Sequence, residues 1–202
     1  ISVIPGANGR LQPGDIHAAT ATLARGRVLL LQLEVPVNAV LAAIAIARDA
    51  GVFTLLDPAP ATAGLPEALL DVDLLCPNES EAALLSGFPV RNEDEAIRAA
   101  QHLHTRGARN VIVTRGKAGV VVCDHEGKTW REAAMPVTAV DTTAAGDAFA
   151  GALAVALARG EVLGPALCFA VRAGALAATR PGAQPGMPTY EALSGFYSDP
   201  ES

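Results

Sequence analysis

The chain has 202 residues, 50% of them hydrophobic, with 15 basic and 21 acidic residues and a formal net charge of −6 at pH 7. This length and apolar content suit one domain with a full core, so we expect residues 1–202 to form a single domain. The acidic balance and the absence of a basic stripe argue against a nucleic-acid partner. No apolar run approaches a membrane span and no leader pattern is present, which predicts a cytoplasmic protein with no membrane partner.

Strand and helix patterns alternate along the chain. Continuous apolar runs predict strands covered on both faces at 28–33, 52–56, 74–76 and 111–114. Helices are expected at 15–25, 37–50, from 78, and at 92–107, and a strand pair at 120–123 and 129–131. A last strand-like run at 137–140 precedes two apolar helices, one after 147 and one near 165–178. This order predicts a doubly wound, mostly parallel sheet flanked by helices, with an antiparallel pair late in the chain.

Local signals set some of these boundaries. Asp15 can cap the first helix, and Gly51 can end the helix at 37–50. Asn92 followed by Glu95 predicts a capping box at the start of the helix at 92–107. Residues 1–4 have the composition of the end of a strand, so we expect the chain to begin within the fold.

Five polar residues lie at or just after the ends of predicted strands. They are Glu34, Asp57, Asn78, Thr114 and Asp141. In open α/β sheets, ligands bind outside the carboxyl ends of the strands. We therefore expect a binding site at this edge.

The stretch at 140–149 carries the strongest chemical signal. A tight turn of small residues opens directly into a helix that is apolar on nearly every side, which predicts a buried helix start. The amide groups of Ala144–Asp147 and the positive end of the helix dipole would then form a site for an anion. In the alternative, Asp147 only stabilises the dipole and Asp141 or Thr143 is the N-cap, which explains the two acids around the turn less well.

Residues Asp141-Thr142-Thr143-Ala144-Ala145-Gly146-Asp147 resemble the second signature of the ribokinase/PfkB family of carbohydrate kinases. Other segments resemble the same family in its own order: Gln32-Leu33-Glu34, Asp57-Pro58-Ala59-Pro60, Cys76-Pro77-Asn78-Glu79-Ser80-Glu81, Val113–Gly119 and Thr179–Pro185. The resemblance covers essentially the whole chain. It implies a ribokinase-like three-layer sandwich of which residues 1–202 form the carboxy-terminal portion. The amino-terminal strands, their Gly-Gly-x-Gly-x-Asn motif that grips the sugar, and most of the lid are then absent from this sequence.

For function, the resemblance implies ATP-dependent phosphorylation of D-ribose to D-ribose 5-phosphate. Asp147 would be the catalytic base that accepts the proton of the sugar hydroxyl, and Ala144, Ala145 and Gly146 would form the anion hole. Alternatives are a sibling kinase for another sugar or a nucleoside and, from a different class, a non-catalytic nucleotide-binding fragment. A homodimer is a further expectation for the full-length protein.

The resemblance also assigns the nucleotide and sugar contacts. ATP would be bound by Asn78, Thr114, Arg115, Gly116, Lys117, Ala118, Gly119, Gly146 and Asp147, and the sugar by Glu34 and Asp147. Asn78-x-x-Glu81 would place Mg²⁺ largely through water, with Glu81 as the magnesium residue. Each segment has a plainer alternative: a capping box at Asn78 and Glu81, which can coexist with the metal role, an ordinary turn at 114–119, and a strand-end acid at Glu34.

A potassium site is the last implication. It would be built, mostly from backbone carbonyl groups, by Asp141, Thr143, Ala177, Arg180, Gly182 and Gly186. Without the resemblance, a helix end and a turn with no ion would be the simpler interpretation. Three positions depart from the family pattern: Gly186 replaces a frequent Ser, Val171 replaces a frequent Asn or His near the adenine, and Asp57 replaces Asn.

Overall fold

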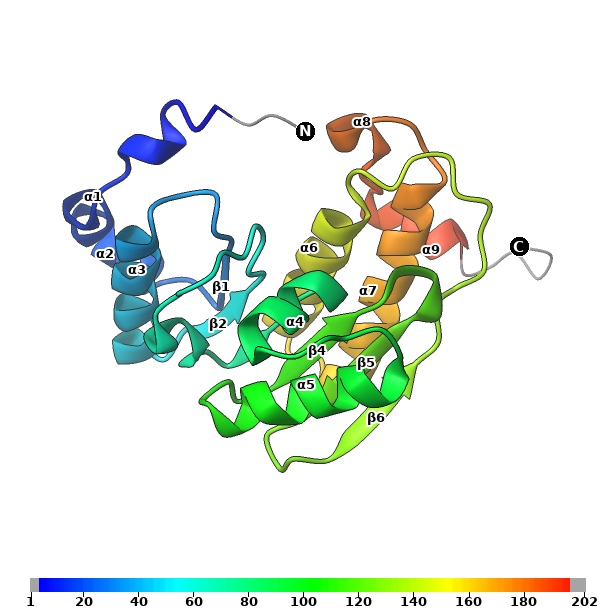
Figure 1. Cartoon of the computed structure of the whole chain (residues 1–202). Helices are drawn as coiled ribbons and strands as arrows, with labels where there is room; N and C mark the ends of the chain where they lie inside the picture. The colour runs from blue at the N-terminus through cyan, green and yellow to red at the C-terminus, as the bar shows by residue number, and fades with distance from the viewer. Residues whose placement is uncertain (1–3, 197–202) are drawn as a thin grey trace. The chain divides into compact units, whose positions relative to one another are not determined.

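The structure is a computed structural model that describes residues 4–196 (Figure 1). It divides into two compact units. The first unit comprises the chain up to Arg115 together with Val120–Arg131, and the second comprises Gly116–Gly119 and the chain from Glu132 onward. Of the strand end predicted at 1–4, residues 1–3 lie outside the described part, and Ile4 is not in a strand.

One sheet of six strands organises the first unit. In spatial order, the strands are β1 (Val28–Leu31), β2 (Phe53–Leu56), β3 (Leu74–Leu75), β4 (Val111–Thr114), β5 (Val120–Cys123) and β6 (Thr129–Glu132). Strands β1 to β4 pair in parallel, and β5 runs antiparallel to β4. The mostly parallel sheet is therefore confirmed. The antiparallel pairing of β5 with β4 was not predicted, and β5 and β6, the predicted pair, are neighbours in the sheet.

Helices flank this sheet. The first unit contains the α-helices α1 (Pro13–Ala18), α2 (Thr20–Leu23), α3 (Val37–Ala50), α4 (Glu79–Ser86) and α5 (Glu93–Thr105), and the short 3₁₀ helices η1 (Asn8–Arg10) and η2 (Glu67–Leu70). Val40 of α3 and Leu103 of α5 share a buried cluster with Leu56, Val113 and other strand residues. Alternate positions of β2 to β5 outside this cluster are also buried, such as Ile112 at 0% exposure, so these strands are covered on both faces as predicted. The same prediction is wrong for β1, which lies at the edge of the sheet and has no buried residue, with Leu30 39% exposed.

Two helix starts differ in detail from the predicted ones. The helix expected at 15–25 is broken into α1 and α2, and its N-cap is Gln12, whose backbone N–H donates to the Asp15 carboxylate at 2.9 Å. At α5, Asn92 is the cap as predicted, but the Glu95 carboxylate accepts from the N–H of Arg91 at 2.7 Å. Arg91 adds a salt bridge to the same carboxylate, and this extra attraction explains why Glu95 turns to Arg91.

The second unit is mainly helical. It contains α6 (Ala145–Ala158), α7 (Leu163–Ala178), α8 (Ala183–Gly186), α9 (Tyr190–Phe196) and the 3₁₀ helix η3 (Gly116–Ala118). A Cβ placed on Gly174 would lie 3.1 Å from the carbonyl oxygen of Ala145, so glycine lets the middle of α7 approach the first turn of α6 closely. Helix α9 packs on α7 through Leu193.

The strand-like run at 137–140 is not a strand. The backbone N–H groups of Val140 and Asp141 both donate to the carbonyl oxygen of Ala178, at 2.8 and 3.1 Å. The segment therefore bonds to the last turn of α7 instead of a neighbouring strand, and it delivers the chain to the start of α6.

Within residues 4–196, no helix combines the length and apolar character needed to cross a membrane. The three cysteines, Cys76, Cys123 and Cys168, are free thiols. Burial raises the pKa of each thiol above its usual value, so the reactive thiolate form is disfavoured at neutral pH.

Candidate active site

The carboxyl ends of β1 to β4 form one edge of the sheet in the first unit. Glu34 is exposed in the bend after β1, Asp57 directly follows β2, Asn78 begins α4 after β3, and Thr114 ends β4. Four of the five polar residues predicted at this edge therefore lie along it. The fifth, Asp141, belongs to the second unit.

Backbone hydrogen bonds hold these strand ends in register. The N–H of Asp57 donates to Leu31 O at 2.9 Å, and the N–H of Cys76 donates to Leu56 O at 2.8 Å. The N–H of Thr114 donates to Pro77 O at 2.9 Å. Each loop after a strand is thus tied to its neighbour, which gives the edge a fixed backbone.

Asn78 and Glu81 form a capping box at the start of α4. Asn78 Oδ1 accepts from the N–H of Glu81 at 3.0 Å, and Glu81 Oε2 accepts from the N–H of Asn78 at 2.9 Å. Asn78 Oδ1 also accepts from the hydroxyl of Ser80 at 2.7 Å. The plainer interpretation of the Asn-x-x-Glu pattern is therefore confirmed, and the magnesium role remains a prediction beside it.

The electrostatics around Glu81 suit a divalent cation. Burial raises the pKa of its carboxyl group, the negative charge of Asp57 raises it further, and the hydrogen bond from Asn78 opposes both. Asp57 accepts a hydrogen bond from the Gln32 amide at 3.0 Å. A bound cation would offset the cost of the partly buried carboxylate, and oxygen ligands are those that Mg²⁺ prefers.

The segment from Thr114 to Gly119 makes a tight turn between β4 and β5. Thr114 forms an isolated parallel bridge with Asn78 at its start. At its end, the N–H of Gly119 donates to Gly116 O at 3.0 Å. Gly119 has φ of +82°, and a Cβ there would lie 2.2 Å from Glu132 O, so only glycine fits. Between the ends, Lys117 is exposed.

Arg115 lies within this segment but its side chain is already engaged. Its Nε donates to Glu79 Oε1 at 3.1 Å, and only 10% of the side chain is exposed. The family resemblance implies a nucleotide contact for Arg115 and no role for Glu79. The sequence feature that could have indicated this ion pair is an acidic residue directly after Asn78 and a basic residue directly after Thr114.

In the second unit, α6 begins without a side-chain cap. Ala144 occupies the N-cap position and its side chain accepts no hydrogen bond, so the alternative with Asp141 or Thr143 as the N-cap is wrong. The N–H of Ala145 donates to Thr142 O at 3.2 Å. A Cβ on Gly146 would meet nothing within 4 Å. The predicted burial of this helix start is wrong, because Gly146 and Asp147 are both exposed. The first turn has open space over Gly146, where an anion can approach the main chain.

Asp147 is exposed at the third position of α6. A carboxylate here is favoured by the helix dipole, and exposure leaves it accessible to an external hydroxyl group. The side chain and the neighbouring Gly146 backbone thus offer two different functions in one turn: a proton acceptor and an anion site.

Asp141 connects the turn before α6 with the turn after α7. Its Oδ1 accepts from the hydroxyl and the N–H of Thr143, at 2.5 and 3.0 Å, and its Oδ2 accepts from the N–H of Gly182 at 2.8 Å. The Thr143 hydroxyl, then the Gly182 and Thr143 amides, lower the pKa of Asp141. The carboxylate is therefore stabilised in its charged form.

The predicted potassium residues share this region. A Cβ on Gly186 would lie 3.5 Å from Arg180 O, 3.7 Å from Ala177 O and 3.8 Å from Pro181 O, so three carbonyl oxygens lie near this glycine. Carbonyl oxygens are the kind of ligand predicted for potassium, and the cation site remains a prediction. Val171, the position predicted near the adenine, is half-buried on α7.

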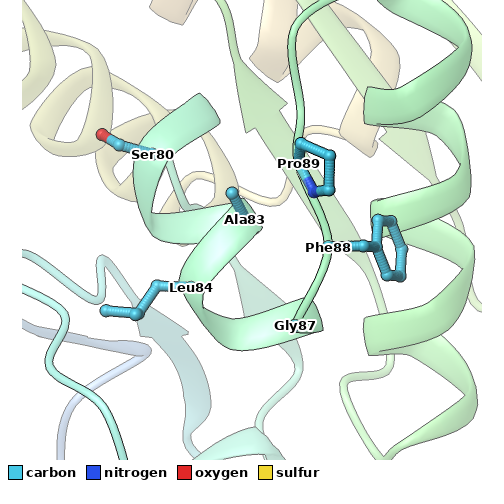
Figure 2. A pocket seen from close by; sticks show the side chains of 6 residues that line it. All are labelled: Ser80, Ala83, Leu84, Gly87, Phe88 and Pro89. Carbon is cyan, nitrogen blue, oxygen red and sulfur yellow. The ribbon is translucent and has the colours of Figure 1, made fainter.

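The first unit also has a surface hollow of about 480 Å³ at α4 and the residues that follow it (Figure 2). It is lined by Ser80, Ala83, Leu84, Gly87, Phe88 and Pro89. None of the predicted site residues lines it, and its lining is mostly apolar. The hollow therefore does not match the polar chemistry predicted for the site.

Comparisons with known proteins agree with these motifs. The model of the pfkB family carbohydrate kinases matches residues 2–190. A ribokinase of Haemophilus influenzae is 38% identical over 196 residues, which cover 97% of this chain and 64% of the relative. A deoxyribokinase of Salmonella typhi is 35% identical, with coverage of 98% and 65%. The structure of Arabidopsis thaliana ribokinase complexed with ribose and ATP is 29% identical, with a TM-score of 0.90 and coverage of 98% and 64%.

The chain thus spans just under two thirds of the length of these relatives. Both compact units fall within the matched residues, apart from the last part of α9. The matched residues therefore include the sheet edge and the start of α6. On this evidence the chain belongs to the pfkB family of carbohydrate kinases.

Proposed function

We propose that the protein to which these residues belong is a ribokinase, which transfers the γ-phosphoryl group of ATP to the 5-hydroxyl group of D-ribose. The observation that carries the proposal is the start of α6, where an uncapped first turn with open space at Gly146 adjoins the exposed carboxylate of Asp147. Relatives named ribokinase support the choice of sugar. We further propose that residues 1–202 form the carboxy-terminal portion of one kinase domain.

In this mechanism Asp147 accepts the proton of the sugar hydroxyl as its oxygen attacks the γ-phosphorus. The bond from that phosphorus to the bridging oxygen breaks, and ADP leaves. The main chain of Ala144, Ala145 and Gly146 stabilises the negative charge of the phosphoryl group during its transfer. Phosphoryl transfer depends mainly on such positioning and charge stabilisation, and the base is needed as the hydroxyl attacks.

Other residues bind and orient the reactants. We assign the nucleotide to Asn78 and to the segment Thr114–Gly119, and the sugar to Glu34 and Asp147. Mg²⁺, held through water near Glu81, would neutralise phosphate charge. K⁺ would bind the carbonyl oxygens around Gly186 and, through Asp141 and Thr143, support the turn before α6.

A sibling kinase is the second candidate, because a deoxyribokinase is 35% identical over nearly the whole chain. The two acceptors differ only in the 2-hydroxyl group of the sugar. The ratio of kcat/KM for D-ribose and 2-deoxy-D-ribose decides between them, and nucleosides complete the panel of acceptors.

The test uses a protein that spans the full length of the relatives and contains these residues. ATP consumption is measured with each acceptor, and the product is identified by mass spectrometry. Ribose-dependent formation of D-ribose 5-phosphate supports the proposal. Binding of ADP without phosphorylation of any acceptor would instead support a non-catalytic nucleotide-binding protein.

Location and assembly are further proposals. We propose a cytoplasmic protein that forms a homodimer at full length. Light scattering of the full-length protein measures its mass in solution, and the mass of a monomer at micromolar concentration would contradict the proposed homodimer.

A further inference from the structure

Arg115 belongs to a row of four side chains of alternating charge in the first unit, in the order Glu79, Arg115, Glu93 and Arg131. Its Nε lies 3.1 Å from Glu79 Oε1 and its Nη1 lies 3.8 Å from Glu93 Oε2. Glu93 also pairs with Arg131, at 3.0 Å from Oε1 to Nη1. The Arg115 side chain is only 10% exposed, whereas that of Arg131 is 74% exposed. A guanidinium group this buried depends on its counter-charges, because an unpaired buried charge is costly.

The partners of Arg115 occupy informative positions. Glu79 is the first residue of α4 and directly follows Asn78, and Glu93 is the first residue of α5. Arg115 directly follows Thr114, whose backbone bridges Asn78. Two independent links therefore join the end of β4 to the start of α4: the backbone bridge and the Arg115–Glu79 ion pair. A carboxylate at each helix start is also favoured by the helix dipole.

We infer that Arg115 is a positioning residue, which fixes the nucleotide segment Thr114–Gly119 to the starts of α4 and α5 and does not itself bind phosphate. The inference rests on the proposed function, since it takes this segment to hold ATP. The guanidinium group orients the backbone on either side of it through Glu79 and Glu93. Its own donors are directed at carboxylates and remain so when nucleotide binds.

Two variants separate positioning from direct phosphate binding. Arg115→Met removes the charge and keeps the aliphatic stem, so both models predict weaker nucleotide binding. Glu79→Gln keeps the arginine and weakens its main anchor. If Arg115 bound phosphate directly, its release from Glu79 would maintain or increase nucleotide affinity. If Arg115 positions the segment, Glu79→Gln lowers affinity as Arg115→Met does.

The first experiment measures ADP binding to the 202-residue chain by titration calorimetry, with magnesium present. We expect Arg115→Met and Glu79→Gln each to weaken binding by roughly three- to thirtyfold, which lies within the range of coupling found between contacting residues. Arg115→Lys, which keeps the charge but loses the planar fork, should recover part of the affinity. Unchanged or tighter binding by Glu79→Gln would overturn the inference.

The second experiment tests the segment without nucleotide. Lys117 and Lys128 are the only lysines in the chain, and both are exposed, so a protease specific for lysine can cut at two places. Lys117 lies in the nucleotide segment, and Lys128 lies before β6 and serves as the internal reference. Cleavage of a transiently open segment follows the population of its open form. We expect Arg115→Met and Glu79→Gln to raise the rate at Lys117 relative to Lys128 by roughly tenfold, as for the loss of a charged hydrogen bond.

Arg131→Met is the matched control, because it removes the exposed ion pair to Glu93 and leaves the Arg115–Glu79 pair intact. Its cleavage ratio and ADP affinity should equal those of the unaltered chain. An unchanged ratio in both Arg115→Met and Glu79→Gln would contradict the inference, and a parallel rise at both lysines would show general unfolding and contradict it too. Absence of ADP binding by the unaltered chain would count against the proposed function, while the cleavage ratio would still decide on positioning.

Discussion

Two helices of the molecule begin at predicted site residues, and they begin differently. Helix α4 closes its own first turn, because Asn78 and Glu81 exchange hydrogen bonds between side chain and main chain. Helix α6 has Ala144 in the corresponding place and receives no side-chain cap. A good N-cap stabilises a helix by about 0.5–2 kcal/mol, so α6 lacks a stabilising interaction that α4 has.

Packing compensates for the missing cap. Phe149 and Leu153 of α6 are buried, and Gly174 allows close contact between α7 and the first turn of α6. A helix held by its apolar sides depends less on its end groups for stability, and at the start of α6 the N–H of Ala145 donates within the turn, to Thr142 O. The start of α4 is rich in polar side chains, but these side chains bond to its own first turn. The start of α6 consists of alanines and a glycine without a side-chain cap, and we propose this one as the anion site.

The largest effect that would test this comparison is expected for Asp147→Asn. Loss of a general base should lower kcat of the full-length protein by about two to four orders of magnitude. ADP affinity and the free energy of unfolding should change little, because Asn keeps the size of the side chain. Steady-state kinetics and calorimetry measure the two quantities. Glu161→Gln, beyond the end of α6, is the control, and turnover near the original value in Asp147→Asn would refute the assignment of the base.

Gly146→Ala should separate stability from activity. Alanine is the better helix former by about 0.5–1 kcal/mol, so the free energy of unfolding should rise. The added methyl group occupies the open space where the phosphoryl group would approach, and kcat/KM should fall by roughly tenfold or more.

Gly151→Ala is the matched control for this change. A Cβ on Gly151, in the middle of α6, also meets nothing within 4 Å. It should stabilise the protein to a similar extent, as measured by urea denaturation, without lowering kcat/KM. Equal kinetics for the two variants would mean that the start of α6 is not the anion site.

A smaller effect is expected at Gly186. Full-length protein should turn over faster in K⁺ than in Na⁺, because the two ions differ in size. Carbonyl oxygens lie 3.5–3.8 Å from a Cβ at this position, an ordinary contact distance, so Gly186→Ser should fit and add one oxygen ligand. It should lower the K⁺ concentration for half-activation by roughly threefold, the scale of one net hydrogen bond. Equal rates in both salts would eliminate the cation site, and Gly186→Ala controls for the added bulk.

The smallest effect is expected in how the free energy of unfolding varies with pH, through Glu81 at the start of α4. The pKa of Glu81 is raised above its usual value of 4.5, chiefly by burial. Between the usual and the raised value, the folded chain binds a proton that the unfolded chain has released, so this group's contribution to stability is lost as pH rises through that window. Glu81→Gln keeps the capping box and removes the titration. The difference in unfolding free energy between the two proteins, from denaturation at several pH values, should therefore vary with pH, and a constant difference would contradict the shift.

The sequence predicted what depends on near neighbours. Helix α3 and its stop at Gly51 followed from periodicity and a left-handed glycine, and the cap at Asn78 from residues three apart. Contacts distant in sequence were not predictable. The run at 137–140 has the composition of a strand, but Val140 bonds to Ala178 O at the end of α7.

In the candidate site, too, features set by neighbouring residues were predictable and contacts between distant residues were not. The uncapped turn before Asp147 was visible as a local pattern, and the structure confirms that α6 starts there. The pairing of Arg115 with Glu79 joins residues 36 apart, and no local pattern specifies it. The effect of burial on Glu81 likewise depends on the packing of the chain around it.

The close approach at Gly119 has a consequence for how this sequence can vary over generations. Every amino-acid replacement that one nucleotide change can make in a glycine codon introduces a Cβ, and a Cβ at Gly119 would overlap the backbone of Glu132. Backbone cannot rotate aside as a flexible side chain can, so no amino-acid replacement at this position is a neutral first step, and only synonymous changes of the codon are neutral. Gly116, also at positive φ but with open space around it, tolerates a side chain sterically. Within one turn, selection should therefore hold the second glycine more tightly than the first.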